Sequence, residues 1–145
     1  MELSLSGKLL VALLLTSAFN TGLIWIVQIV HYPGFLRISP ETYASYQQFH
    51  MRAISYIVAP SMVVELLLTV AGLAMSDLSG SYLYWTAALC LALVWVVTFF
   101  ISVPLHGSLV NGYSAESIQR LIDTNWLRTV GWSLRTGLLA LILLR

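Results

Sequence analysis

The sequence has few charged residues and a single cysteine, and both shortages exclude whole classes of protein. Charged residues make up 9% of the 145 residues, whereas a soluble domain carries about 25%. With 59% hydrophobic residues, the chain is also far too apolar to be disordered. Its net charge of +1 gives no basic surface for nucleic acid. The lone Cys90 excludes an internal disulfide and a zinc site built on cysteines. The composition therefore predicts an integral membrane protein.

Several catalytic signatures are missing as well. The sequence has no Gly-x-Ser-x-Gly, no glycine loop that cradles phosphate, no His-Glu-x-x-His and no Cys-x-x-Cys. Serine-type nucleophilic catalysis, nucleotide binding and zinc sites with local spacing therefore find no support in the sequence.

Four apolar segments are long enough to cross a membrane, because a spanning helix needs roughly 20 mostly apolar residues. We expect spans over about residues 9–30, 53–75, 82–105 and 126–144. We interpret the first as a retained helix rather than a signal peptide, since its apolar run resumes through Leu23 to Val27. The predicted fold is all-α, a four-span transmembrane antiparallel helix bundle that forms a single integral membrane domain over residues 1–145.

The second and fourth helices are expected to extend beyond the membrane on one side. Ser39 and Ser114 are suitable N-caps, and Pro40 suits a first helical position. A kink is expected at Pro60. The arginines in and beside the two longer connections favour a cytoplasmic location for this side, with both termini outside. These arginines are Arg37, Arg52, Arg120 and Arg128.

Polar residues in each predicted helix fall on one side of its axis, at about 100° per residue. A polar side chain in lipid is costly unless it faces protein or a wet cavity, so these stripes should point into the bundle. In helix order, the stripes are Ser17, Asn20, Thr21, Gln28 and His31; Tyr43, Tyr46, Gln47, His50, Ser61 and Glu65; Thr98, Ser102 and His106; and Asn125, Arg128, Trp132 and Arg135.

Asn20, Glu65 and Arg135 form the deep part of these stripes, roughly 14–18 Å below one membrane surface. We expect Glu65 and Arg135 to form an ion pair beside Asn20, since an unpaired charge at this depth costs several kcal/mol. This buried polar layer either ties the helices together, or it acts as a proton relay or as the floor of a ligand cavity.

All three histidines of the chain are predicted to gather near one membrane surface, together with Asn125 and Arg128. His31, His50 and His106 would bind a metal ion or haem, act as acid and base at a metal-free site for a lipid-like or quinone-like ligand, or be interfacial residues satisfied by water. Arg128 would anchor a lipid headgroup or, with Asn125, orient an anionic substrate group.

Short motifs in both halves of the chain carry a family resemblance. Val103-Pro104-Leu105-His106-Gly107-Ser108-Leu109, then Asn125-Trp126-Leu127-Arg128-Thr129 and Trp132-x-x-Arg135, together with His31-Tyr32-Pro33, resemble small four-span membrane proteins of the anthrone-oxygenase-like family and uncharacterised bacterial relatives. His106 stands where that family has an asparagine. The resemblance implies a four-helix membrane bundle and, for some members, oxygenation of polycyclic phenolic substrates. It points to His31, His106, Asn125, Trp126, Arg128 and Arg135.

Two functions stay open at this point. One is a small membrane oxidoreductase or oxygenase that acts on a lipophilic substrate from the bilayer at a histidine-containing site. The other is a non-enzymatic membrane subunit or small-ligand carrier with a structural polar core. The expected partners are the lipid bilayer, a lipophilic small molecule, and further copies of the chain or a larger complex.

Overall fold

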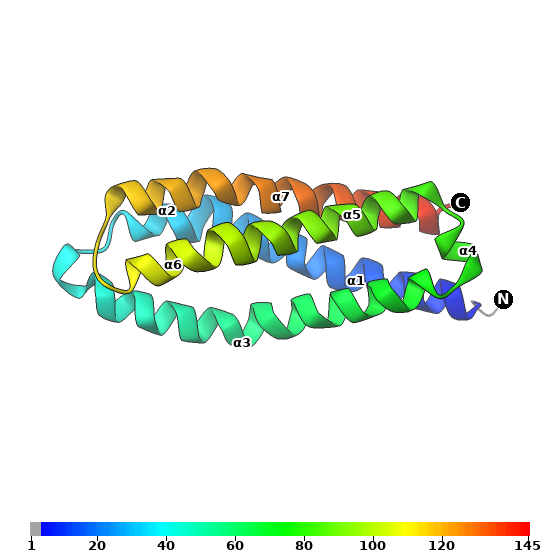
Figure 1. Cartoon of the computed structure of the whole chain (residues 1–145), viewed down its shortest axis with the longest axis horizontal. Helices are drawn as coiled ribbons and strands as arrows, with labels where there is room; N and C mark the ends of the chain where they lie inside the picture. The colour runs from blue at the N-terminus through cyan, green and yellow to red at the C-terminus, as the bar shows by residue number, and fades with distance from the viewer. Residues whose placement is uncertain (1–3) are drawn as a thin grey trace.

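The computed structural model describes residues 4–145 as four long helical rods (Figure 1). The first rod joins α1 (Leu5–Ile26), a π-helical turn η1 (Val27–His31) and α2 (Tyr32–Phe35). The second is α3 (Pro40–Leu73), which a short helix α4 (Ser76–Ser79) follows. The third joins α5 (Tyr82–Val97), a second π-helical turn η2 (Thr98–Ser102) and α6 (Val103–Leu109). The fourth is α7 (Ala115–Leu143). Between residues 4 and 145 no strand occurs, and the all-α prediction is confirmed.

Three of the rods are long and apolar enough to cross a membrane, namely Leu5–Phe35, Pro40–Leu73 and Tyr82–Leu109. They fit an integral, multi-pass membrane protein. The fourth span expected at residues 126–144 is not established, because α7 does not reach the apolar character of the other rods. Arg128 and Arg135 lower its hydropathy within that stretch.

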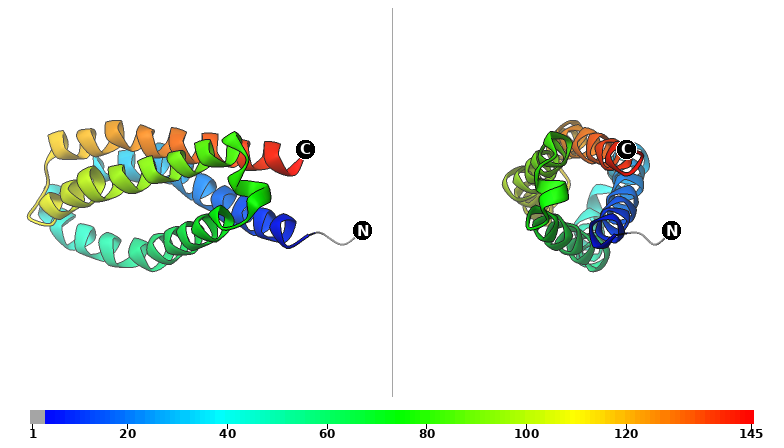
Figure 2. Two further views of the ribbon diagram at one scale, coloured as in Figure 1. Left: turned by 45° about the vertical axis from the view of Figure 1, so that its right-hand side comes forward. Right: turned by 90° about the vertical axis from the view of Figure 1, so that its right-hand side faces the viewer.

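The rods lie side by side in the two views of Figure 2, and each runs opposite to the next along the chain. Both ends of the described chain lie at one end of the bundle, next to α4. The connections before α3 and before α7 lie at the other end, which we call the histidine end because His31 and His106 are beside it. α7 packs against α5 and α1, and α3 packs against α1. α3 and α5 are in contact beside α4, where Tyr84 bonds the carbonyl of Thr69, but along most of their length they are not closely packed.

α3 and α7 begin where the sequence predicts. The Ser114 hydroxyl accepts a hydrogen bond from the backbone N–H of Ser117 at 3.2 Å, as an N-cap should. Ser39 precedes α3 but makes no capping bond, since its hydroxyl pairs with that of Thr42 at 3.0 Å. α3 continues through Pro60 and is bowed in Figure 2, as expected where a proline removes one helical hydrogen bond.

Both π-helical turns directly precede an X-Pro pair. The backbone N–H of Tyr32 bonds the carbonyl of Val27, and that of Val103 bonds the carbonyl of Thr98. Pro33 and Pro104, which follow, have no N–H of their own. The extra residue in each turn rotates the side chains beyond it by about 100° relative to a uniform α-helix. The direction of the side chains after each turn is therefore set by these turns.

Two apolar clusters fill the bundle, one on each side of the polar layer. The cluster at the histidine end contains Ile24, Phe35, Tyr43, Leu121 and Trp132 among others. The cluster at the opposite end contains Leu10, Leu13, Leu78, Tyr84, Ala87 and Leu139. Many large apolar side chains, such as Leu89 and Phe100, are exposed on the outside. This outer surface is compatible with a lipid bilayer.

Candidate functional site

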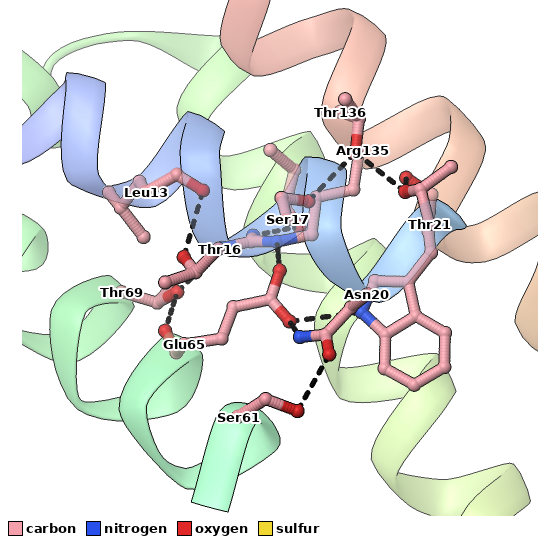
Figure 3. Close-up of polar contacts among 12 residues, drawn as sticks. Leu13, Thr16, Ser17, Asn20, Thr21, Ser61, Glu65, Thr69, Arg135 and Thr136 are labelled. Carbon is pink, nitrogen blue, oxygen red and sulfur yellow. Dashed lines mark hydrogen bonds and ion pairs between the residues drawn. The ribbon is translucent and has the colours of Figure 1, made fainter. Parts of the chain in front are cut away.

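Glu65 is the centre of a polar layer that joins α1, α3 and α7 (Figure 3). Arg135 Nε donates to Glu65 Oε1 at 2.7 Å, which confirms the predicted ion pair. Asn20 Nδ2 and Trp132 Nε1 donate to Glu65 Oε2 at 2.8 and 2.9 Å. All four side chains are buried. The carboxylate is therefore neutralised by one cation and held by two further donors.

The remaining donors of Arg135 are used as well. Its Nη1 donates to the carbonyl of Ala87 and its Nη2 to Thr69 Oγ1, both at 2.7 Å. Asn20 Oδ1 accepts from Ser61 Oγ at 2.8 Å. Within residues 4–145 no buried polar atom of Glu65, Arg135 or Asn20 lacks a partner. A closed network of this kind favours an interhelical tie over a proton relay, because a relay needs a position that can accept a proton.

A cavity of about 400 Å³ lies between this polar layer and the histidine end. Most of its wall is apolar, with Ile24, Met62 and Phe99 among the lining residues. Its polar side chains come from all four rods and are Asn20, Tyr32, His50, Ser55, Thr98, Ser102, His106 and Arg128. An apolar cavity with a few convergent polar groups is the usual form of a small-molecule site.

The cavity reaches the outside of the bundle between α3 and the α5–η2–α6 rod. Ala59 and Val63 of α3 line it and are exposed, as are Phe99 and Val103 on the opposite wall. These rods are two of the three that can cross a membrane. The opening of the cavity therefore lies on the apolar outer surface of the bundle.

His106 is held at both ring nitrogens inside this cavity. Gln47 Nε2 lies 2.9 Å from His106 Nδ1 and 3.3 Å from the His106 carbonyl oxygen, so the amide NH₂ donates to both. With Nδ1 as an acceptor, the neutral ring carries its proton on Nε2. Nε2 lies 2.9 Å from the Tyr32 hydroxyl oxygen and donates to it. With the Gln47 amide in this orientation, His106 does not accept the hydroxyl proton of Tyr32, which can then be donated to another partner.

The other two histidines share a hydrogen bond. His31 Nε2 and His50 Nδ1 are 2.8 Å apart, and their ring centroids are 4.5 Å apart. The His50 ring centroid is 5.3 Å from that of His106, so the structure brings the three imidazoles together. His50 lines the cavity, and its Nε2 has no hydrogen-bond partner among residues 4–145. His31 is half-buried and does not line the cavity.

The geometry of the imidazoles does not suit a metal ion held by all three histidines. No three histidine, cysteine or acidic side chains in the described part of the chain are placed to hold a metal. Both ring nitrogens of His106 already have partners, and His31 and His50 direct nitrogens at each other. The metal site expected at His31, His50 and His106 therefore has no support in the structure.

Asn125 and Arg128, which the sequence places together, lie in different surroundings. Asn125 Nδ2 donates to Gln28 Oε1 at 2.8 Å, and Gln28 Nε2 donates to the carbonyl of Ile122 at 3.1 Å. This pair ties η1 to α7 away from the cavity. Arg128 lines the cavity and donates from Nη1 to Ser102 Oγ at 3.3 Å. Arg128, rather than Asn125, can contact a ligand there.

No family model, curated protein or solved structure matches this chain. The contacts around the cavity are therefore the basis for assigning a function.

Tyr32 and Trp95 line the cavity but were not among the predicted site residues, and Tyr32 entered the sequence analysis only within the motif His31-Tyr32-Pro33. Tyr32 falls off the stripe of the first helix when each residue advances by about 100°. The π-helical turn before Tyr32 rotates its side chain back toward the interior of the bundle. The neighbouring Pro33 was the only sequence signal of this turn. Gln47 was on a predicted stripe, but no pattern linked it to His106.

Proposed function

We propose that this protein is an integral membrane enzyme that takes a lipophilic molecule from the bilayer and catalyses proton transfer on it, as one step of an oxidation. One observation carries the proposal. Tyr32 has a free hydroxyl proton and His50 a free ring nitrogen, and both line the same apolar cavity. An acid and a base that share one site can move a proton from a carbon to an oxygen of a bound ketone.

Tyr32 is the proposed acid. It donates its proton to the carbonyl oxygen of the substrate, and the phenolate that forms accepts the hydrogen bond from His106 Nε2. Gln47 holds His106 in the tautomer that this hydrogen bond requires. His106 is thus a positioning residue that stabilises charge on Tyr32.

His50 is the proposed base. Its Nε2 removes a proton from the CH₂ carbon that is conjugated with the carbonyl, which in an anthrone lies across the central ring from it. Its Nδ1 passes a proton to Nε2 of His31 across the 2.8 Å hydrogen bond. His31 is only half-buried, so it can exchange that proton with the outside. The ketone becomes an enol that carries the proton of Tyr32 on its oxygen, while the histidine pair holds the proton from carbon. Tyr32 then regains a proton before the next turnover.

The resemblance to the anthrone-oxygenase-like family suggests the reaction that follows. Enolisation converts an anthrone into an electron-rich phenol, which dioxygen oxidises. One anthrone and one O₂ give one anthraquinone and one water, with O₂ as the oxidant and the ring carbon oxidised. The chain's own residues would supply the proton transfers and an apolar site for this reaction.

We also propose that α7 crosses the membrane as a fourth span. It has 29 residues and runs along the whole bundle in Figure 1. Its two deep arginines, Arg128 and Arg135, are buried among the other rods and so are shielded from lipid. The positive-inside rule then favours a cytoplasmic histidine end, with both chain ends on the other side.

Anthrone oxidation by the purified protein in detergent tests the enzymatic proposal. We expect anthraquinone to form in air, and we expect Tyr32→Phe and His50→Gln each to lower turnover by about 10²–10⁴-fold, the usual contribution of an acid or base. Tyr56→Phe is the matched control, because Tyr56 is 76% exposed on α3 and does not line the cavity. Absorbance of the quinone gives the rate.

The same measurements separate the enzyme from the carrier. Anthrone that binds but is not oxidised faster than in a protein-free sample would contradict the enzyme and favour a small-ligand carrier. The closed polar layer around Glu65, which is suited to holding helices together, fits either protein. No binding of anthrone at all would contradict both an enzyme and a carrier that act on anthrone itself.

A further inference from the structure

Arg128 and Arg135 lie on the same helix and are both buried, but they have very different partners. Arg135 bonds a carboxylate, a backbone carbonyl and a threonine hydroxyl, all at 2.7 Å. Among residues 4–145, Arg128 makes one hydrogen bond of good geometry, of 3.3 Å to Ser102, and its guanidinium also lies near the Tyr32 hydroxyl. A guanidinium has five N–H donors, so most of those of Arg128 are unused.

No acidic side chain among residues 4–145 forms an ion pair with Arg128. The ion pair of Arg135 with Glu65 is the one found between residues 4 and 145. The Trp132 ring, 5.5 Å from the Arg128 guanidinium carbon, offers only the weaker attraction of an aromatic face. A buried cation without an anion is strongly unfavourable, so a bundle that keeps one needs a compensating partner.

Trp95 lines the same cavity and carries a second unused donor. Trp95 Nε1 and Arg128 Nε are buried and have no acceptor among the described residues. Ser102, which also lines the cavity, can turn its hydroxyl hydrogen to a ligand while it accepts from Arg128. These groups together offer one positive charge and several donors, and an oxygen-bearing anion is their complement.

We infer that the ligand of this cavity carries a carboxylate on an apolar body, and that Arg128 binds this carboxylate. The inference rests on the proposed function, since it names the class of substrate for the same cavity. A planar carboxylate accepts two parallel hydrogen bonds from a guanidinium, and its single negative charge matches the single unpaired cation. The apolar lining from α3 and η2 accommodates the rest of the molecule.

The matched pair of anthracene carboxylate and anthracene carboxamide tests this inference on the unmodified protein. The two probes have the same rings and nearly the same size, and they differ in charge. Binding to the full chain in neutral detergent is measured by the anisotropy of anthracene fluorescence. We expect the carboxylate to bind about tenfold to a hundredfold more tightly, the range of a charged hydrogen-bonded pair.

Variants of Arg128 test whether this residue is the source of the preference for the carboxylate. Arg128→Gln should reduce the affinity for the carboxylate to that for the carboxamide and leave carboxamide binding unchanged. Arg128→Lys, which keeps the charge but loses the planar fork, should fall between the two. Arg120→Gln is the matched control, because Arg120 is an exposed arginine on the same helix. An equal loss in Arg120→Gln would overturn the assignment to Arg128.

Three further results would count against the inference. Equal binding of both probes would overturn the carboxylate preference and leave the cavity as a lipophilic site. Binding of neither probe, nor of anthrone, would overturn the proposed function along with it. Displacement of the carboxylate by phosphatidylglycerol but not by phosphatidylcholine would reassign Arg128 to a lipid headgroup.

Discussion

At the scale of single residues, Glu65 and Arg135 neutralise each other's charge inside the bundle, away from lipid. The carboxylate accepts hydrogen bonds from three side chains on two other rods. These hydrogen bonds replace the ones that the carboxylate would make to water. The network leaves no buried polar atom of the pair unsatisfied within the described residues. An intact buried ion pair contributes little to the free energy of unfolding. Loss of one partner is strongly destabilising, because the remaining charge is then buried alone.

Glu65→Gln should therefore lower stability. The variant keeps a side chain of similar shape but leaves Arg135 without its counter-charge, and breaking a buried pair costs about 3–5 kcal/mol. We expect a lower unfolding temperature by circular dichroism in detergent. Glu41→Gln, an exposed glutamate on the same helix, should unfold as the wild type does.

A double variant checks the cause of that loss. Adding Arg135→Met to Glu65→Gln removes the isolated charge and should recover part of the stability. If Glu65→Gln instead unfolded like the wild type but no longer oxidised anthrone, the polar layer would be part of the reaction and not a tie.

At the scale of helices, the inward stripes could be predicted from the sequence, and the site within them only in part. A constant turn of about 100° per residue places Asn20, Glu65 and Arg135 on inner faces, and all three are buried. The same constant turn fails for Tyr32, because a π-helical turn precedes it. The pairing of polar residues, such as Gln47 with His106, depends on how two helices are rotated about their axes relative to each other. The spacing of polar residues within one helix does not contain this information.

Gly72 shows how closely α3 approaches the start of α5. A Cβ at this position would lie 2.7 Å from Cζ of Tyr84 and closer still to its hydroxyl oxygen. That hydroxyl donates to the carbonyl of Thr69 at 2.8 Å, so Tyr84 is held in place and cannot withdraw without losing the bond. The absence of a side chain at Gly72 is therefore a packing requirement.

Gly72→Ala should destabilise the bundle by about 1–3 kcal/mol, the usual range for overpacking a well-filled site. Gly22→Ala is its control, since a Cβ there meets no atom within 4 Å, and alanine is the better helix former by roughly 0.5–1 kcal/mol. Thermal unfolding of the two variants in the same detergent should shift in opposite directions. If Gly72→Ala unfolded at the wild-type temperature, the Tyr84 side chain would be able to adopt another conformation.

At the scale of the whole molecule, hydropathy and three-dimensional structure describe α7 differently. By composition it is the least apolar of the four rods, and only the other three qualify as membrane spans. In the bundle its polar residues face inward, where Arg128 borders the cavity and Arg135 the polar layer. Polar side chains that face the interior of a bundle lower the hydropathy of their helix without exposing charge to lipid, so low hydropathy does not by itself exclude the proposed fourth span.

If α7 crosses the membrane, its two ends lie on opposite sides, and cysteine labelling can show this. Asn111 lies in the connection before α7, and Arg145 follows the end of α7. Each is replaced by cysteine in a Cys90→Ser variant, which lacks the native cysteine. A maleimide that cannot cross membranes should label Arg145→Cys in intact cells and Asn111→Cys only after lysis, because the positive-inside rule favours a cytoplasmic histidine end. The reverse pattern would keep four spans and invert their orientation. Labelling of both positions from one side would show that α7 does not cross, and the bundle would then have three spans.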